Sequence, residues 1–285
     1  GDRCWMRPVA WRTTDGRTWS RSLAWPTPSI ETDAYRAMIA TAWAIPGGGW
    51  AALLWSVSGV ANTPIGVFRS SDARAWSGPA PRLPGQGQLD EALDGWGPGA
   101  ADAAGRSVVG QSFYSEDPGL ADERTVLRSA TVGATRWSPV AGIPTADWAA
   151  ILAPGPATDG RWRVAGTLAD GELGWAEVWS SSDLATWTIE RLPTGTASGA
   201  ELADLALTGW GEVAVGRLAD EEGGRLACSW ARTPGEAWTL VPVAGEADAG
   251  GPELIADGPA GLLGISSPGQ TEAGDDRPAG AWLLR

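Results

Sequence analysis

The sequence predicts an all-β protein of many short strands, from three observations: abundant turn residues, a repeated turn ending in Trp, and a repeated apolar run ending in Gly. Gly occurs 40 times and Pro 21 times among 285 residues, far above the ~12% combined share of an average globular chain. These residues separate short apolar runs, which is typical of closely spaced turns between strands. The hydrophobic content of 43% is enough to form a folded core.

The first repeat is a short Ser/Thr/Asp turn followed by Trp. The marker tryptophans recur about every 50–60 residues, a period typical of repeat architectures. Asp or Ser in such a turn accepts backbone hydrogen bonds and Gly tolerates positive φ, while the Trp has a large surface to bury. The five copies span Trp11–Trp19, Phe68–Trp76, Leu127–Trp137, Trp179–Trp187 and Trp230–Trp238.

The second repeat is the apolar run ending in Gly, which lies between the Trp turns. Its copies are Val108–Gly110, Val164–Gly166, Ala214–Gly216 and Leu262–Gly264. Each period therefore has room for about four short strands, as in a β-propeller blade. In one period we expect strands at Leu202–Thr208, Glu212–Arg217, Arg225–Trp230 and Trp238–Val243.

We therefore expect residues 1–285 to form a single β-propeller domain of about five four-stranded blades, with six blades as the alternative. Residues 8–22 have the pattern of third and fourth strands, and residues 252–285 that of first, second and third strands. Pairing of the N- and C-terminal strands would close the ring without a free edge. One third-strand candidate, Val9–Thr14 or Ala281–Arg285, is then surplus.

The turn motif resembles the Asp-box, or BNR, repeat of sialidase-type propellers, which is found in many secreted actinobacterial proteins. In that repeat a Ser-x-Asp-x-Gly-x-x-Trp turn joins the third and fourth strands of a blade. The copies here are degenerate, because Gly is lost after Asp72 and Asp183 and Pro234 replaces Asp. The resemblance extends over nearly the whole chain and implies an architecture and a structural role for the turn residues, not a particular enzyme.

Charge and composition exclude several classes of function. The net charge is −13 and all 21 basic residues are Arg, which disfavours nucleic acid as a partner. The absence of His removes a Ser-His-Asp triad and the usual zinc ligand. Cys4 and Cys228 form either one disulfide or two buried thiols. No apolar run approaches the ~18 residues of a membrane span, and we expect a secreted or cell-surface protein whose leader or anchor has been removed.

Carboxylates recur near the start of each expected innermost strand. In a propeller these positions line the mouth of the central channel, on the face opposite the Asp boxes, where they would form a ring of negative charge. Such a ring would bind Ca²⁺, an amine or sugar hydroxyls, although solvated acids in turns explain the same pattern. The candidates are Asp33, Asp90 with Glu91, Asp147, Glu201 and Glu253.

These patterns favour a non-catalytic, extracytoplasmic binding module or interaction scaffold that holds a protein or glycan partner at one propeller face. The alternative is a glycoside hydrolase that uses acids at the channel mouth. A sialidase is excluded because it requires an arginine triad and a Tyr–Glu pair: the chain has only two Tyr, and Arg36 is the one Arg near the start of an innermost strand. Trp43, Trp96 and Trp148 are candidates for stacking on a sugar, and all three fit a place in the core equally well.

Overall fold

The structure is a computed structural model, and it describes strands and turns throughout with no helix among the residues it places. Within those residues no helix could cross a membrane. The contacts divide the chain into two compact units, Gly1–Val140 and Ala141–Arg285, and the expectation of a single domain stays a prediction. The described residues are 9–12, 18–22, 37–45, 47–58, 61–78, 92–114, 123–131, 134, 136–143, 148–152, 159–170, 173–219, 224–242, 254–258, 261–265, 269–270, 276–277 and 281–284.

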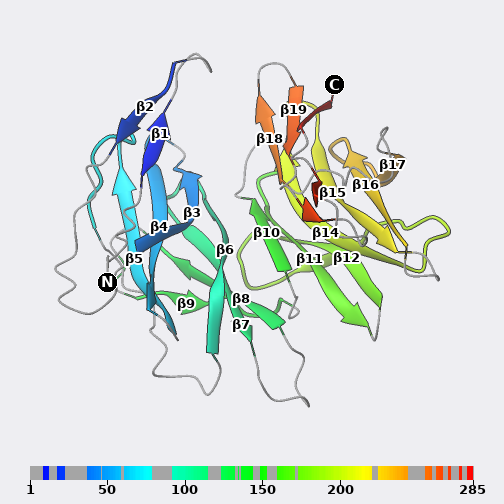
Figure 1. Ribbon diagram of the computed structural model, residues 1–285. Helices are drawn as coiled ribbons and strands as arrows, with labels where there is room; N and C mark the ends of the chain where they lie inside the picture. Colours follow the sequence, from blue (N-terminus) through cyan, green and yellow to red (C-terminus); the bar gives the residue numbers. More distant parts are fainter. Residues whose placement is uncertain are drawn as a thin grey trace. The chain divides into compact units, whose positions relative to one another are not determined.

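The first unit contains three antiparallel sheets (Figure 1). A two-stranded sheet is followed by a three-stranded and a four-stranded one, each with its strands in chain order. The strands of the larger sheets bury apolar side chains such as Leu53, Val67 and Val109. The strands are β1 (Ala10–Arg12) and β2 (Ser20–Ser22); β3 (Ala37–Ala44), β4 (Trp50–Ser58) and β5 (Ala61–Ser70); and β6 (Ala92–Ala101), β7 (Ser107–Tyr114), β8 (Glu123–Ala130) and β9 (Ser138–Pro139).

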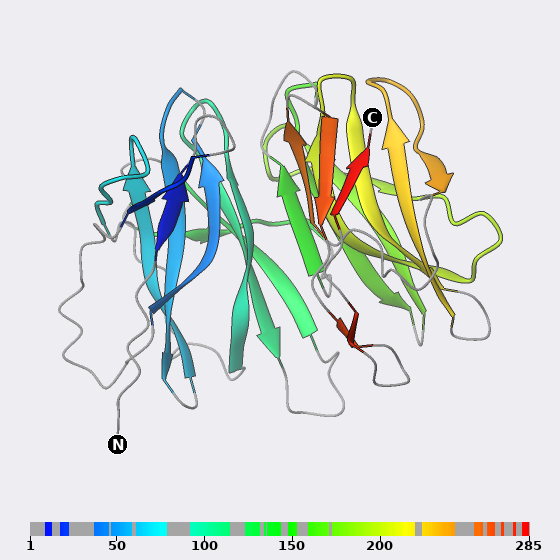
Figure 2. The ribbon, with the colours of Figure 1, turned by 45° about the horizontal axis from the view of Figure 1, so that its top comes forward.

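The second unit contains two four-stranded sheets, a three-stranded sheet and a small hairpin. Figure 2 shows the three-stranded sheet, β18–β19–β22, as adjacent strands in orange to red. The strands are β10 (Trp148–Leu152), β11 (Trp162–Asp170), β12 (Leu173–Ser181) and β13 (Thr188–Arg191); β14 (Gly199–Leu207), β15 (Glu212–Ala219), β16 (Arg225–Arg232) and β17 (Thr239–Pro242); β18 (Leu254–Gly258), β19 (Gly261–Ile265) and β22 (Ala281–Leu284); and the hairpin β20 (Gly269–Gln270) with β21 (Asp276–Arg277).

The apolar runs that end in Gly form the second strand of their sheets, as the sequence predicts. Gly216 in β15 shows why the position excludes a side chain: a Cβ there would lie 2.0 Å from the carbonyl oxygen of Glu201 on β14. The four strands expected between Leu202 and Val243 are β14–β17, in the predicted order. The repeat period therefore located each strand of this sheet to within about three residues.

Tryptophan supplies much of the core, as the repeats predict. Trp162, Trp179 and Trp230 are fully buried, and the turn residue Trp238 is 7% exposed, whereas the turn residue Trp19 is 55% exposed. Trp43, for which the sequence left sugar stacking and the core equally open, is 5% exposed and packs among apolar side chains, so it belongs to the core. The side chains of Trp96 and Trp148 lie outside the described part of the structure.

The terminal strands form separate sheets. β1 pairs with β2, while β22 is the third strand of the last sheet. Among the described strand pairs, none joins the two ends of the chain in the way expected for ring closure. Five sheets of three or four strands follow the β1–β2 pair, and both the surplus third strand and the choice between five and six blades stay predictions.

Hydrogen bonds join neighbouring sheets inside the second unit. The Leu202 N–H on β14 donates to Thr167 Oγ1 on β11 at 2.9 Å, and the Ile255 N–H on β18 donates to Asp204 Oδ2 on β14 at 2.8 Å. Trp230 Nε1 donates to the carbonyl of Pro193 at 2.7 Å. These bonds fix the spacing between sheets and provide a rigid frame for side chains at their edges.

Candidate polar cavity between two sheets

The turns between third and fourth strands mark one edge of each sheet. Asp183 Oδ1 accepts the N–H groups of Ala185 and Thr186 at 2.8 Å, and these bonds lower its pKa to about 2. The turn at Asp72 repeats the arrangement. Ala73 and Leu184, which stand where Gly is lost, nevertheless have φ of 58° and 64°. Both turns therefore keep the left-handed backbone conformation although neither has glycine, the residue that adopts it most easily.

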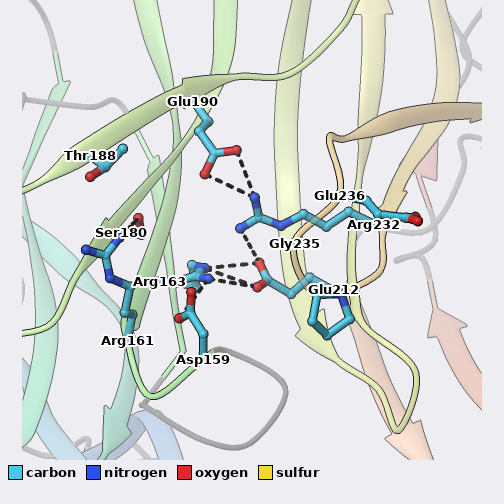
Figure 3. A pocket seen from close by; sticks show the side chains of 11 residues that line it. Asp159, Arg161, Arg163, Ser180, Thr188, Glu190, Glu212, Arg232, Gly235 and Glu236 are labelled. Carbon is cyan, nitrogen blue, oxygen red and sulfur yellow. Dashed lines mark hydrogen bonds and ion pairs between the residues drawn. The ribbon is translucent and has the colours of Figure 1, made fainter.

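A cavity of about 270 Å³ opens at this edge, between the sheets β10–β13 and β14–β17 (Figure 3). Its lining is mostly polar and comes from strand ends and turns, so the backbone of two sheets positions the side chains. The residues are Asp159, Arg161, Arg163, Ser180, Thr188, Glu190, Glu212, Arg232, Pro234, Gly235 and Glu236.

Glu212 on β15 is the centre of a buried ionic network. Its carboxylate accepts from Arg163 Nε at 3.1 and 3.2 Å and from Arg232 Nη2 at 2.9 Å. The side chains of Glu212, Arg163 and Arg232 are only 4%, 5% and 8% exposed. Arg232 Nη1 also binds both oxygens of Glu190, at 3.0 and 2.8 Å. The network therefore links β11 and β13 of one sheet to β15 and β16 of the next.

Arg232 is held from several directions. Its guanidinium carbon lies 4.6 Å from the ring centroid of Trp238, close enough for a cation–π contact. Burial by itself lowers the pKa of Arg232, but the negative charges of Glu212 and Glu190 outweigh it and raise that pKa above its ordinary value. Arg232 thus stays charged, and the cavity wall keeps its shape.

The Arg163 guanidinium has fewer hydrogen-bond partners than donors. Its Nη2 lies 3.1 Å from Glu212 Oε1 and 3.2 Å from Asp159 Oδ1. Its Nη1, although buried, has no hydrogen-bond partner. An unpaired charged donor in such a position is uncommon in folded proteins.

Each acid of the cavity already has a partner within the protein. Asp159, Glu190 and Glu212 each pair with an arginine, and Glu236 accepts from the Thr233 hydroxyl.

Of the acids predicted from the repeats, the structure describes only Glu201, which is not among the cavity residues. Glu201 is on β14, opposite Arg217, whereas the cavity residue Glu212 is at the far end of the same sheet. Glu201 pairs with Arg225 at 3.1 Å, and both side chains are about half exposed, at 41% and 57%. The other candidates, Asp33, Asp90, Glu91, Asp147 and Glu253, lie outside the described residues. The ring at the channel mouth therefore stays a prediction.

The proposed Ca²⁺ site and disulfide also involve residues beyond those described. Within the described part of the chain, no three acids, His or Cys are grouped in a way that could hold a metal ion. Cys228 is a free cysteine, 2% exposed, and burial raises the pKa of its thiol to about 12. Cys4 is not among the described residues, so pairing of the two cysteines stays a prediction.

Sequence reasoning missed the cavity, although one signal was available. Arg163 stands between Trp162 and Val164, and Glu212 precedes Val213, in strands buried on both faces. A charge inside such a strand requires a partner. Opposite charges in successive repeats were therefore a clue that two neighbouring sheets form an ion pair.

Comparison with known proteins shows similarity of fold without similarity of sequence. No protein-family model and no curated protein matches this chain. A solved structure of a protein of unknown function from Dyadobacter fermentans has a TM-score of 0.59 and 14% identity over 96% of this chain and 82% of its own.

Two sugar-processing enzymes have the same fold. The α-L-arabinanase of Penicillium chrysogenum, complexed with arabinobiose, has a TM-score of 0.52 and 12% identity over 82% of this chain and 72% of its own. The GH93 α-L-arabinofuranosidase of Fusarium graminearum, also with arabinobiose, has a TM-score of 0.51 and 9% identity over 89% of this chain and 83% of its own. The chain is therefore an all-β propeller whose structural neighbours include propeller glycoside hydrolases.

Proposed function

We propose that this protein is a non-catalytic binding module of secreted or cell-surface location, and that it holds a polar ligand, in the first instance a glycan, in the cavity between β10–β13 and β14–β17. The observation that carries the proposal is the cavity itself: about 270 Å³ of polar-lined space in which each acid is already engaged. Ligand sites of this kind place a few fixed polar groups in a concave surface.

An exposed aromatic side chain supports a glycan as the ligand. Trp210 is 53% exposed and lies in the turn between β14 and β15. The Thr208 hydroxyl accepts from the N–H groups of Trp210 and Gly211, at 3.3 and 3.0 Å, and so orders this turn. Because Leu207, Glu212 and Arg232 are in register across the sheet, Trp210 extends from the same edge as the cavity. A flat apolar ring beside polar groups matches the two faces of a sugar.

Ligand-dependent thermal unfolding tests this proposal. A ligand that binds only the folded protein raises Tm, by about 2.7 kcal/mol of stabilisation at 100 times its Kd. We expect the effect from a member of an oligosaccharide panel, and we expect Thr188→Trp, which fills the cavity mouth, to abolish it. Ile189→Trp is the matched control, since adjacent strand residues point to opposite faces and Ile189 is 51% exposed. No ligand effect, or equal loss in both variants, would overturn the proposal.

The second candidate is a carboxylate-dependent glycoside hydrolase. The propeller fold of the two arabinobiose-bound enzymes favours it, together with the acids expected at the channel mouth. Two carboxylates in reach of one glycosidic bond are sufficient for hydrolysis. Reducing-sugar release from arabinan should then be measurable and be lost in Asp90→Asn and Glu201→Gln, while Thr188→Trp remains active. Absence of release from arabinan and related glycans by the native protein would exclude this candidate.

A further inference from the structure

The further inference concerns the outer edge of the Arg163 guanidinium. A guanidinium offers two paired edges, one formed by Nε with one Nη and the other by the two Nη groups. In Arg163 the first edge, Nε with Nη2, faces Glu212 at 3.1 to 3.2 Å. The second edge is half used, because Nη2 contacts Asp159 at 3.2 Å while Nη1 has no partner. This edge is built for two parallel bonds and makes one.

Asp159 is a weakly held occupant of that edge. Its side chain is 59% exposed, and its backbone is in the left-handed region with φ of 52°, in the turn that leads into β11. A single contact from a largely exposed carboxylate is weak, because water competes for that carboxylate. A stronger acceptor can therefore displace Asp159 without disturbing the pair between Arg163 and Glu212.

Arg161 is positioned to contribute a second cation. Arg161 directly precedes β11 and Arg163 is its second residue, and both side chains line the cavity. Arg161 Nη1 is 3.5 Å from Ser180 Oγ, and among the described residues Arg161 makes no ion pair. Figure 3 shows Arg161 beside Asp159, with its guanidinium toward Ser180, and the Arg163 guanidinium between Asp159 and Glu212.

We infer that the cavity takes an oxyanion, a carboxylate or phosphate group of the bound molecule, on the outer edge of Arg163 with Arg161 beside it. The oxyanion replaces Asp159 and gives Nη1 the partner that it lacks. Paired N–H donors in one plane match a carboxylate or phosphate and do not match a single hydroxyl. The inference rests on the proposed binding function and specifies the chemical class of ligand for the same cavity.

Titration calorimetry of the full chain at constant ionic strength tests the inference, with acetate, inorganic phosphate, glucuronate and neutral glucose as probes. We expect acetate or phosphate to bind, and we expect glucuronate to bind more tightly than glucose. The tighter of acetate and phosphate shows whether the cavity prefers a carboxylate or a phosphate group. Asp159→Asn removes the competing charge and should tighten binding about two- to fivefold. Arg161→Gln should weaken it about tenfold, while Arg225→Gln, which removes an exposed cation at the opposite end of the sheet, should leave it unchanged.

The outcomes separate this inference from the proposed function. Oxyanion binding that responds to Asp159→Asn and Arg161→Gln in opposite directions, with Arg225→Gln as wild type, supports it. Oxyanion binding that is equal in the three variants, or absent both from wild type and from Asp159→Asn, overturns it. If the native protein binds a neutral glycan but no oxyanion, and Thr188→Trp abolishes glycan binding, the inference is overturned while the proposed binding function stands. Failure of every ligand, neutral or charged, overturns both.

Discussion

Two ion pairs in the second unit provide a test of how much burial determines the contribution of an ion pair to the free energy of unfolding. Glu212 with Arg163 and Glu201 with Arg225 both have contacts of 3.1 Å. They differ in exposure, with side chains at 4% and 5% in the first pair and at 41% and 57% in the second. We expect Glu212→Gln to lower the free energy of unfolding by about 3–5 kcal/mol and Glu201→Gln by about 0–1 kcal/mol.

The larger loss of stability expected for Glu212→Gln follows from the groups around Glu212. Both of its oxygens accept from arginines, so the amide of Gln directs a donor at another donor and leaves two buried cations undercompensated. Urea unfolding of both variants, followed by fluorescence of the buried tryptophans, measures the difference. Tm should fall on the order of 10 °C for Glu212→Gln. Equal losses in the two variants would refute the reasoning that burial of this network governs its energy.

Three further predictions concern the turns, the core and the cysteines. Ala73→Gly should raise stability by about 1 kcal/mol in urea unfolding, because φ at this position is 58° and Gly removes the left-handed strain; a loss would contradict this. Burial raises the pKa of Asp204 to about 6, so the folded state binds its proton more tightly and stability should decrease between pH 4 and pH 6, by up to about 3 kcal/mol more than in Asp204→Asn. Cys228 should react with a thiol reagent only after unfolding, and two reactive thiols without reductant would exclude a bond to Cys4.

The strand pattern was predictable from sequence because it is local and repeated. Turn residues at a fixed period bound each strand, and the apolar run ending at Gly216 marked a second strand before any contact was known. The same reasoning located β1 and β2 near the start and β18, β19 and β22 near the end. It left the role of Trp43 open, since the sequence around a tryptophan next to a turn is the same whether its ring is buried or exposed.

The cavity depended on tertiary structure because its residues come from two repeats. Arg163 and Glu212 are 49 positions apart, and nothing local shows that β11 and β15 face one another across neighbouring sheets. The free Nη1 of Arg163 is a property of distances between side chains rather than of residue type. By itself the sequence determined the fold class, the strand order and the absence of histidine chemistry. Only the packing of one sheet against the next decided which charges meet and which donor is left without a partner, since burial and pairing are set by neighbours distant in the chain.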